Sequence, residues 1–140
     1  SNGILLPGTS VAARQPKQKE KNEEWILAVV LNFHPDKNKY QVEDVEQDEY
    51  GQKQKYTLQP RNVIPIPTAG DPDFLPEIHV GQDVLALYPG TTCFYRATVA
   101  QTPNKDMNQP KSYKVKFEDD NNEIKTVMQE YILQIPKGKS

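Results

Sequence analysis

The chain has 140 residues, of which 36% are hydrophobic, with a formal net charge of −2, so it suits one ordinary domain or two very small ones and not a protein that coats nucleic acid. A single cysteine, Cys93, excludes an intrachain disulfide and indicates a reducing compartment, and two histidines are too few for a zinc cluster. No apolar stretch approaches the roughly 20 residues of a membrane span, and no signal peptide is visible.

The first half of the chain, taken in order, consists of short strand-forming runs separated by turn chemistry. Alternation is clearest where Tyr40, Val42 and Asp44 share one face. A turn between paired strands is indicated by Pro35-Asp36-Lys37-Asn38, and a tight turn by Pro60-Arg61-Asn62. The polar stretch 15–24 is typical of a loop. We predict strands at residues 10–14, 25–34, 40–45, 56–58 and 63–66.

The second half repeats the plan. Prolines and asparagines mark the stretch 102–110 as a loop. We predict a hairpin turn at Asp119-Asp120-Asn121-Asn122 and a tight turn at 129–131, before the last strand. We predict strands at residues 83–88, 92–101, 112–117, 124–128 and 132–134.

Both halves therefore form an internal repeat of apolar runs, closed in each copy by a similar segment, Val63-Ile-Pro-Ile-Pro and Ile132-Leu-Gln-Ile-Pro. Five short antiparallel strands with a turn before the fifth describe a small SH3-like barrel, which closes its edges and presents a mouth built from loop ends. The predicted fold class is all-β, with two tightly packed five-stranded SH3-like barrels in tandem. We expect repeat 1 at 6–67, a linker at 68–77 and repeat 2 at 78–136.

Three aromatic residues continue inward-facing rows of the second repeat and stand where strands end: Tyr88, Tyr95 and Phe117. Beside Glu118 and Asp119, they form a candidate aromatic cage. Ring faces hold a methylated ammonium by cation–π attraction, and a rim carboxylate adds Coulomb attraction. The alternative interpretation is that the three rings are ordinary core or edge aromatics.

The stretch Val84-Leu-Ala-Leu-Tyr-Pro-Gly-Thr-Thr-Cys-Phe-Tyr-Arg-Ala97 resembles the most distinctive motif of the SAGA-associated factor 29 family. Val11-Ala-Ala-Arg, Trp25-Ile-Leu-Ala and Asn38-Lys-Tyr-Gln-Val-Glu-Asp extend the resemblance over residues 6–136. These proteins are tandem Tudor histone readers of the SAGA histone-acetyltransferase coactivator. The resemblance implies a nuclear chromatin reader that binds the histone H3 amino-terminal tail with di- or trimethylated lysine 4, with SAGA/ADA histone acetyltransferase subunits as partners.

Carried over by position, the resemblance implies a methyl-lysine cage of Tyr88, Tyr95, Phe117 and Asp119. It implies that Asp44 and Glu46 form a pocket for the free amino terminus and first alanine of the tail, and that Thr92 contacts the peptide. Two positions depart from the family pattern. Glu46 stands where aspartate is expected, and Gly90 stands where a side-chain amide can occur, so any contact there is lost or passes to the backbone.

The residues themselves support this division of roles. Asp44 is the repeat-one counterpart of Phe117, and Glu46 that of Asp119, so one mouth is acidic where the other is aromatic. An α-amino group keeps its N–H donors and is best held by carboxylates, whereas a quaternary ammonium is best held by rings. Because the first and fourth residues of an extended tail lie about 10 Å apart at most, the two mouths are expected to face each other closely.

Other functions find little support in the sequence. It has no nucleophile elbow, phosphate-binding glycine loop or metal-ligand spacing, so we expect no catalysis and no cofactor. The alternatives left open are a structural domain that docks on other subunits without reading methyl-lysine, and a methylarginine reader. Lys111, Lys114 and Lys116 are expected to protect a sheet edge, with no sequence-specific binding of nucleic acid.

Overall fold

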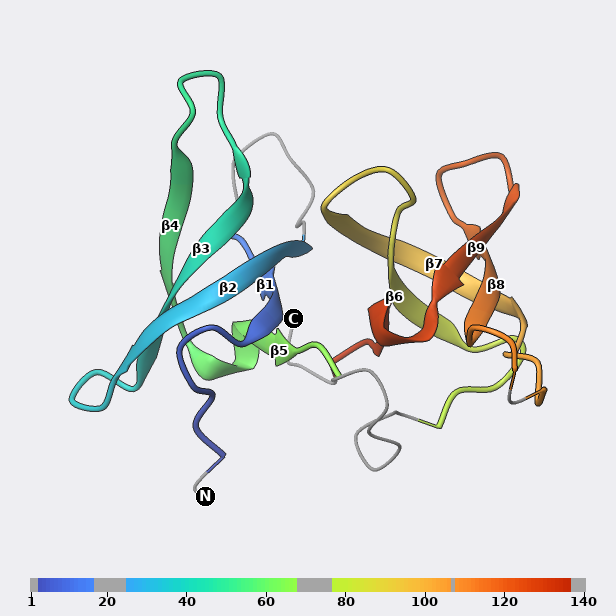
Figure 1. Ribbon diagram of the computed structural model, residues 1–140, viewed down its shortest axis with the longest axis horizontal. Coiled ribbons are helices and arrows are strands. Elements are labelled where there is room, and N and C mark those ends of the chain that lie inside the picture. The colour runs from blue at the N-terminus through green and yellow to red at the C-terminus, as the bar shows by residue number, and fades with distance from the viewer. Residues whose placement is uncertain (1–2, 17–24, 68–76, 107, 137–140) are drawn as a thin grey trace. The chain divides into compact units, whose positions relative to one another are not determined.

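In the computed structural model, which describes residues 3–16, 25–67, 77–106 and 108–136, the chain is almost entirely β-structure (Figure 1). It divides into two compact units. Unit 1 comprises Ser1–Ile66 with Thr92–Phe94, and unit 2 comprises Pro67–Thr91 with Tyr95–Ser140. The fold is two SH3-like barrels in tandem, as the strand pattern predicts.

Unit 1 has five antiparallel strands in the order β4-β3-β2-β1-β5. They are β1 (Ser10–Arg14), β2 (Trp25–His34), β3 (Lys39–Gln47), β4 (Lys53–Leu58) and β5 (Val63–Pro65), with the 3-10 turn η1 (Pro60–Asn62) before β5. The segment Thr92–Phe94 also belongs to this unit, because Phe94 lies opposite Trp25 and Cys93 opposite Ile26 at the start of β2. The strand that carries one residue of the candidate cage therefore begins in unit 1.

Unit 2 repeats the arrangement in the order β10-β6-β7-β8-β9. Its strands are β6 (Asp83–Leu87), β7 (Cys93–Gln101), β8 (Ser112–Phe117), β9 (Ile124–Met128) and β10 (Ile132–Gln134), with the 3-10 turn η3 (Gln129–Tyr131) before β10. In Figure 1 the colours run in chain order, so this unit is the yellow-to-red part of the ribbon.

Each unit has its own hydrophobic core, built from the inward phase of its strands. In unit 1 the buried side chains include Val11, Ala28 and Val42, and in unit 2 their counterparts Val84, Ala97 and Val115, all at 0% exposure. Strand alternation explains the pattern, since every second residue points to the same face. In β8 it is complete, with Tyr113, Val115 and Phe117 buried and Lys114 and Lys116 exposed.

Matching backbone hydrogen bonds confirm the repeat. Gly8 N–H donates to the carbonyl of Val30, and Gly81 N–H donates to the carbonyl of Val99, each at 2.8 Å. Both glycines have positive φ, at 91° and 88°, a conformation that non-glycine side chains rarely adopt. The same tight turn thus precedes the first strand of each barrel.

Predicted and observed strands agree closely, with differences at a few ends. β3 continues to Gln47 and β4 begins at Lys53, because the Asp48 carboxylate accepts the N–H groups of Tyr50 and Gln52 and tightens their hairpin. Tyr88 lies one residue beyond β6, and β5 ends at Pro65. The stretch 17–24 of the first predicted loop and 68–76 of the predicted linker lie outside the described residues.

In the described part of the chain, helical structure is limited to short 3-10 turns, and none of it is a helix long and apolar enough to cross a membrane.

Candidate functional site

Three aromatic rings of unit 2 meet at one end of the barrel. Tyr88 follows β6, Tyr95 lies near the start of β7, and Phe117 ends β8. The Tyr88 ring centroid lies 4.8 Å from that of Phe117 and 6.2 Å from that of Tyr95, with interplanar angles of 64° and 90°. These are favourable edge-to-face contacts between aromatic rings. The structure therefore brings the three predicted cage residues together.

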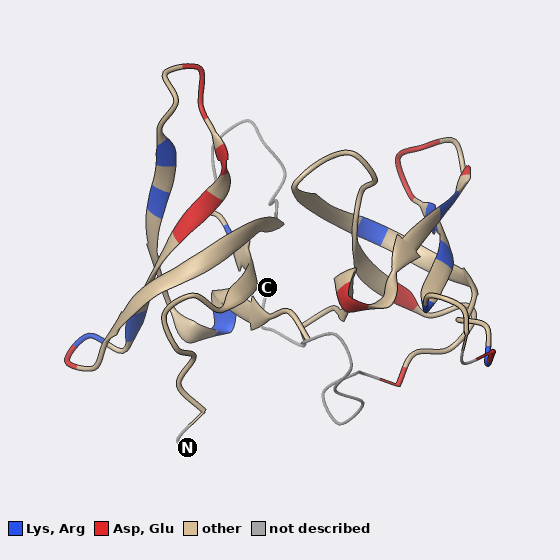
Figure 2. Cartoon of the chain, viewed as in Figure 1, with Lys and Arg blue, Asp and Glu red and all other residues tan. Residues whose placement is uncertain are grey.

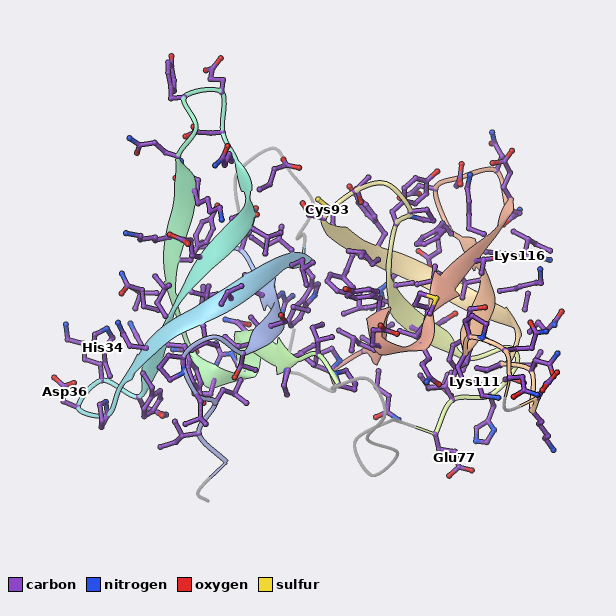
Figure 3. The ribbon with its side chains drawn as sticks, in the orientation of Figure 1. His34, Asp36, Glu77, Cys93, Lys111 and Lys116 are labelled. Atoms are coloured by element: carbon purple, nitrogen blue, oxygen red, sulfur yellow. The ribbon has the colours of Figure 1, made fainter. Side chains whose placement is uncertain are left out.

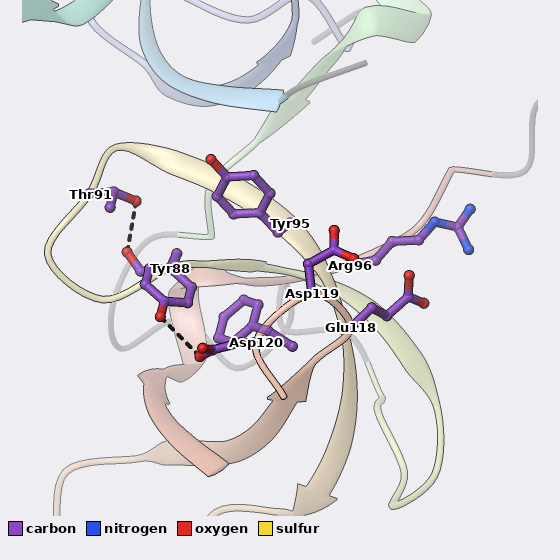
Figure 4. Close-up of a pocket in the computed structure, with 8 residues that line it drawn as sticks. Tyr88, Thr91, Tyr95, Arg96, Glu118, Asp119 and Asp120 are labelled. Atoms are coloured by element: carbon purple, nitrogen blue, oxygen red, sulfur yellow. Dashed lines mark hydrogen bonds between the residues drawn. The ribbon is translucent and has the colours of Figure 1, made fainter. Parts of the chain in front are cut away.

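The rings border an open pocket of about 340 Å³ (Figure 4). Phe117 is only 2% exposed and forms the inner wall, whereas Tyr95 is 39% exposed and Tyr88 is half-buried. The rings are accordingly not sealed inside the protein, and a side chain of a partner can reach them. The residues that line the pocket are Tyr88, Thr91, Tyr95, Arg96, Phe117, Glu118, Asp119 and Asp120.

Carboxylates dominate the polar part of this pocket. Glu118 and Asp119 are exposed, so their charges remain hydrated at the rim. In Figure 4 the Arg96 side chain extends away from Tyr88 and Tyr95. This arrangement attracts a cation, and its walls suit a cation with apolar surface.

A tight turn places Tyr88 relative to Tyr95. The N–H of Thr91 donates to the carbonyl of Tyr88 at 3.1 Å, and its Oγ1 donates to the same oxygen at 2.9 Å. Pro89 and Gly90 occupy the central positions, and Gly90 has φ of 81°, as the third residue of a type II turn requires. Backbone geometry thus accounts for glycine at a position where the family resemblance allows a larger residue.

Asp120, which the sequence assigns only to a turn, holds the Tyr88 hydroxyl. The hydroxyl donates to Oδ2 of Asp120 at 2.9 Å, and Nζ of Lys125 lies 3.8 Å from the same oxygen and 5.6 Å from the Tyr88 ring centroid. The hydrogen bond to Asp120 is the main cause that raises the pKa of Tyr88. The pKa of Lys125 is raised chiefly by its hydrogen bond to Glu123. The only sequence signal for this group was an acidic turn after Phe117.

The acidic residues predicted to bind an amino terminus lie on unit 1. Asp44 and Glu46 belong to β3, where Figure 2 shows acidic residues continuing into the β3–β4 turn. Oδ1 of Asp44 accepts the N–H of Glu46 at 2.9 Å, and the hydroxyl of Thr92 lies 3.5 Å from Oε2 of Glu46. The structure therefore brings Asp44, Glu46 and Thr92 together.

Partial burial is the main cause that raises the pKa of Asp44, and the charge of Glu46 raises it further, against the effect of the Glu46 N–H. A bound cation stabilises the charged form of such a partly buried carboxylate, because it replaces the hydration lost on burial. Tyr56 lies close by on β4, and burial followed by the charge of Asp44 raises the pKa of its hydroxyl. Sequence reasoning did not single out Tyr56.

Strand register shows that the two candidate sites occupy equivalent positions in their own repeats. Asp44 lies opposite Ala28 and Phe117 opposite Ala97, so the acid and the ring occupy the same barrel position. By the same test Tyr56, opposite Val42, corresponds to Lys125, opposite Val115. The register confirms that Asp44 and Phe117 are equivalent positions of the two repeats. A further difference between the copies is that Tyr56 of unit 1 is replaced by Lys125 in unit 2.

Trp25 is buried, Cys93 is partly buried, and the two histidines lie at a strand end and at an exposed position. Trp25 is 7% exposed, with the Arg14 guanidinium 5.8 Å from its ring centroid, and Cys93 packs against the core of unit 1. His34 lies at the end of β2, close to Asp36 of the following turn (Figure 3). His79 lies 3.8 Å from Glu77, and both are exposed. Among the described residues, no group of His, Cys, Asp and Glu could hold a metal ion.

The model of the family described as the SGF29 tudor-like domain matches residues 7–136. The chain is 33% identical over 140 residues to SAGA-associated factor 29 homolog A of Arabidopsis thaliana, covering 95% of the chain and 51% of that protein. It is 38% identical over 121 residues to SAGA-associated factor 29kDa of Drosophila melanogaster, covering 84% of the chain and 39% of that protein.

A third relative is the SAGA complex subunit SGF29 of Saccharomyces cerevisiae, 35% identical over 102 residues, with 72% of the chain and 38% of that protein covered. The chain thus spans about half, or less, of the length of these curated relatives. The family model covers both barrels and both candidate sites. The chain therefore belongs to the SGF29 tudor-like domain family.

Proposed function

We propose that this chain is a chromatin reader module that binds the histone H3 amino-terminal tail carrying di- or trimethylated lysine 4. The cage of Tyr88, Tyr95, Phe117 and Asp119 would hold the methylated ammonium. The observation that carries the proposal is the open pocket of about 340 Å³, walled by three aromatic rings and bordered by carboxylates.

The physical chemistry of the pocket favours a methylated over an unmodified ammonium. Methylation removes N–H donors and lowers the cost of leaving water while the charge stays. Each ring face then contributes roughly 0.5–2 kcal/mol, depending on how far the cation is desolvated. An unmodified ammonium keeps its strong hydration and finds few acceptors on ring faces, so it gains less from this pocket.

The acidic group of unit 1, Asp44 and Glu46, is proposed to bind the free α-amino group of the same tail. Carboxylates suit this cation because they accept charge-assisted hydrogen bonds from its N–H donors. Thr92, whose hydroxyl lies near Glu46, precedes Tyr95 of the cage by three residues along the chain. A peptide contact at Thr92 would therefore adjoin the amino-terminus pocket.

The relatives support a wider role. They are named as SAGA-associated factors and SAGA complex subunits, and we extend this association to the protein that contains the present chain. In this proposal the module works in the nucleus and is not an enzyme. It recruits a histone acetyltransferase complex, with SAGA/ADA subunits as partners, to methylated chromatin in transcription regulation.

Calorimetric titration of the chain with four tail peptides tests the proposal: trimethylated, dimethylated, unmodified, and trimethylated with an acetylated amino terminus. Binding should be strongest for the methylated peptides with a free amino group. Relative to these, it should be weaker for the unmodified peptide and also weaker for the trimethylated peptide with a blocked amine. Equal affinity for methylated and unmodified tails would contradict methyl-lysine reading and favour the subunit-docking alternative. Full affinity after acetylation would contradict the amino-terminus pocket and favour an internal methylated residue.

A further inference from the structure

Among the three cage rings, Tyr88 is the one that lies outside a strand. It follows the end of β6, in a turn, and is half-buried, whereas Phe117 is almost wholly enclosed in the core. A half-exposed ring at a strand end has other rotamers open to it. Packing against the core holds one side of the Tyr88 ring, and a contact at its hydroxyl adds a second restraint on its angles to Phe117 and Tyr95.

Asp120 supplies such a restraint. Its Oδ2 accepts the Tyr88 hydroxyl at 2.9 Å, a hydrogen bond to a charged acceptor and therefore a strong one. Asp120 is itself fixed to the cage, because its N–H donates to the carbonyl of Phe117 at 3.2 Å and its carbonyl accepts the N–H of Glu123 at 2.9 Å. The carboxylate thus ties the ring that follows β6 to the turn that follows β8, and Tyr88 and Asp120 are 32 positions apart.

Lys125 forms an ion pair with the carboxylate of Asp120. Its Nζ lies 3.8 Å from Oδ2 of Asp120 and 3.3 Å from Oε2 of Glu123. The pocket lining includes Tyr88 and Asp120 but not Lys125, so this ammonium does not occupy the space offered to a ligand. It also offsets the charge of Asp120, which reduces any direct attraction of that carboxylate for a bound cation.

We propose that Asp120 is a positioning residue of the cage: it acts on a bound methylated ammonium through the hydroxyl of Tyr88, and Lys125 keeps its carboxylate in place. The consequence for binding rests on the proposed function, but the restraint on Tyr88 does not. A cage formed before the ligand arrives avoids the entropy cost of ordering the ring on binding.

Four variants of the chain separate positioning from simple charge. Asp120→Ala removes the acceptor, and we expect affinity for the trimethylated tail to fall about threefold to tenfold. Asp120→Asn removes the charge but keeps an acceptor oxygen, and should stay within about twofold of wild type. Tyr88→Phe keeps the ring and should match Asp120→Ala. The double variant Tyr88→Phe/Asp120→Ala should lose nothing more, because both changes remove one contact.

Glu123→Gln is the matched control: it removes a second carboxylate partner of Lys125 without touching Tyr88, and should leave affinity unchanged. An Asp120→Asn loss as large as that of Asp120→Ala would assign the effect to charge. Additive losses in the double variant, or an equal loss in Glu123→Gln, would likewise overturn the inference.

A ligand-free measurement separates this inference from the proposed function. NMR of isotope-labelled tyrosine, with Tyr88→Phe identifying the signal, follows the ionisation of the Tyr88 hydroxyl. Asp120→Ala should lower its pKa toward the ordinary tyrosine value, because the hydrogen bond to Asp120 is the main cause of its rise. An unchanged titration would overturn the positioning role, whatever the peptides show. Equal binding of all tails by the wild-type chain would overturn the proposed function instead.

Discussion

At the scale of single residues, the cage rings differ in how far they also support the fold. Tyr95 is 39% exposed, whereas Phe117 is 2% exposed and packs in the core of unit 2. We therefore expect truncation of Tyr95 to weaken binding without lowering stability, and truncation of Phe117 to lower both.

We expect Tyr95→Ala to weaken binding of the trimethylated tail about tenfold, by loss of one ring face, with little change in thermal stability. Phe117→Ala should weaken binding and also lower the free energy of unfolding by about 3–5 kcal/mol, as buried phenylalanine truncations do. Calorimetric titration and denaturant unfolding of both variants measure this. A Tyr95→Ala variant as unstable as Phe117→Ala would show that Tyr95 is structural.

The carboxylate of Asp44 combines a cost to the fold with its proposed role in binding the tail amine. Partial burial raises its pKa above the ordinary 3.8, so the folded chain holds this proton more tightly than the unfolded chain. The stability that Asp44 contributes when protonated is present below pH 3.8 and is lost as pH rises through the folded pKa.

We therefore expect Asp44→Asn to be slightly more stable than wild type at neutral pH and to bind the free tail amine more weakly. Wild-type affinity should decrease as the pH is lowered through the folded pKa of Asp44, and again above about pH 8, where the tail amine loses its proton. Urea unfolding and peptide titration across pH test both parts. A less stable variant at neutral pH would contradict burial as the dominant cause.

At the scale of elements, the turn between β6 and β7 sets the relative positions of Tyr88 and Tyr95. Gly90 has φ of 81°, and a Cβ placed there would meet no atom within 4 Å. Any cost of substitution would thus come from the backbone conformation and not from a steric clash.

Gly90→Ala should destabilise the chain by about 1–2 kcal/mol, the cost of a left-handed conformation for a residue with a Cβ. Gly90→Asn should cost less, because asparagine tolerates this region. Denaturant unfolding of the two variants beside wild type gives the comparison. Equal stability of all three would contradict the type II turn as the reason for glycine.

At the scale of the whole molecule, the proposed function requires both barrels to hold one peptide. The copies share strand order and core but differ at equivalent positions, with Asp44 in one and Phe117 in the other. Divergence of this kind suits a ligand with two unlike cations, a chain-end amine and a methylated ammonium.

The spacing of the tail tests this requirement. Inserting two glycines between the first residue and the methylated lysine should reduce affinity to that of the amino-acetylated tail, since one grip must be released. The same insertion after the lysine should have no effect and serves as the control. Unchanged affinity for the first peptide, measured by calorimetry, would contradict simultaneous binding by the two units.

Local patterns were sufficient for most strands. In β8 the alternation of Tyr113, Val115 and Phe117 with lysines marks both the strand and its buried face, because side-chain direction has a period of two. Lys53 and Lys55 carry no apolar alternation, and the hairpin held by Asp48 decides where β4 begins.

The sequence by itself determined the repeat, the all-β class and which rings could stand at a barrel mouth, because these depend on periodicity and on residue type. Only the tertiary structure decided that the three rings enclose an open pocket, that Thr92 meets Glu46, and that Asp120 holds Tyr88. The contacts of Tyr88 with Phe117, of Tyr88 with Asp120 and of Glu46 with Thr92 join residues 29, 32 and 46 positions apart. Strand register and turn geometry, not local propensity, bring such residues within reach.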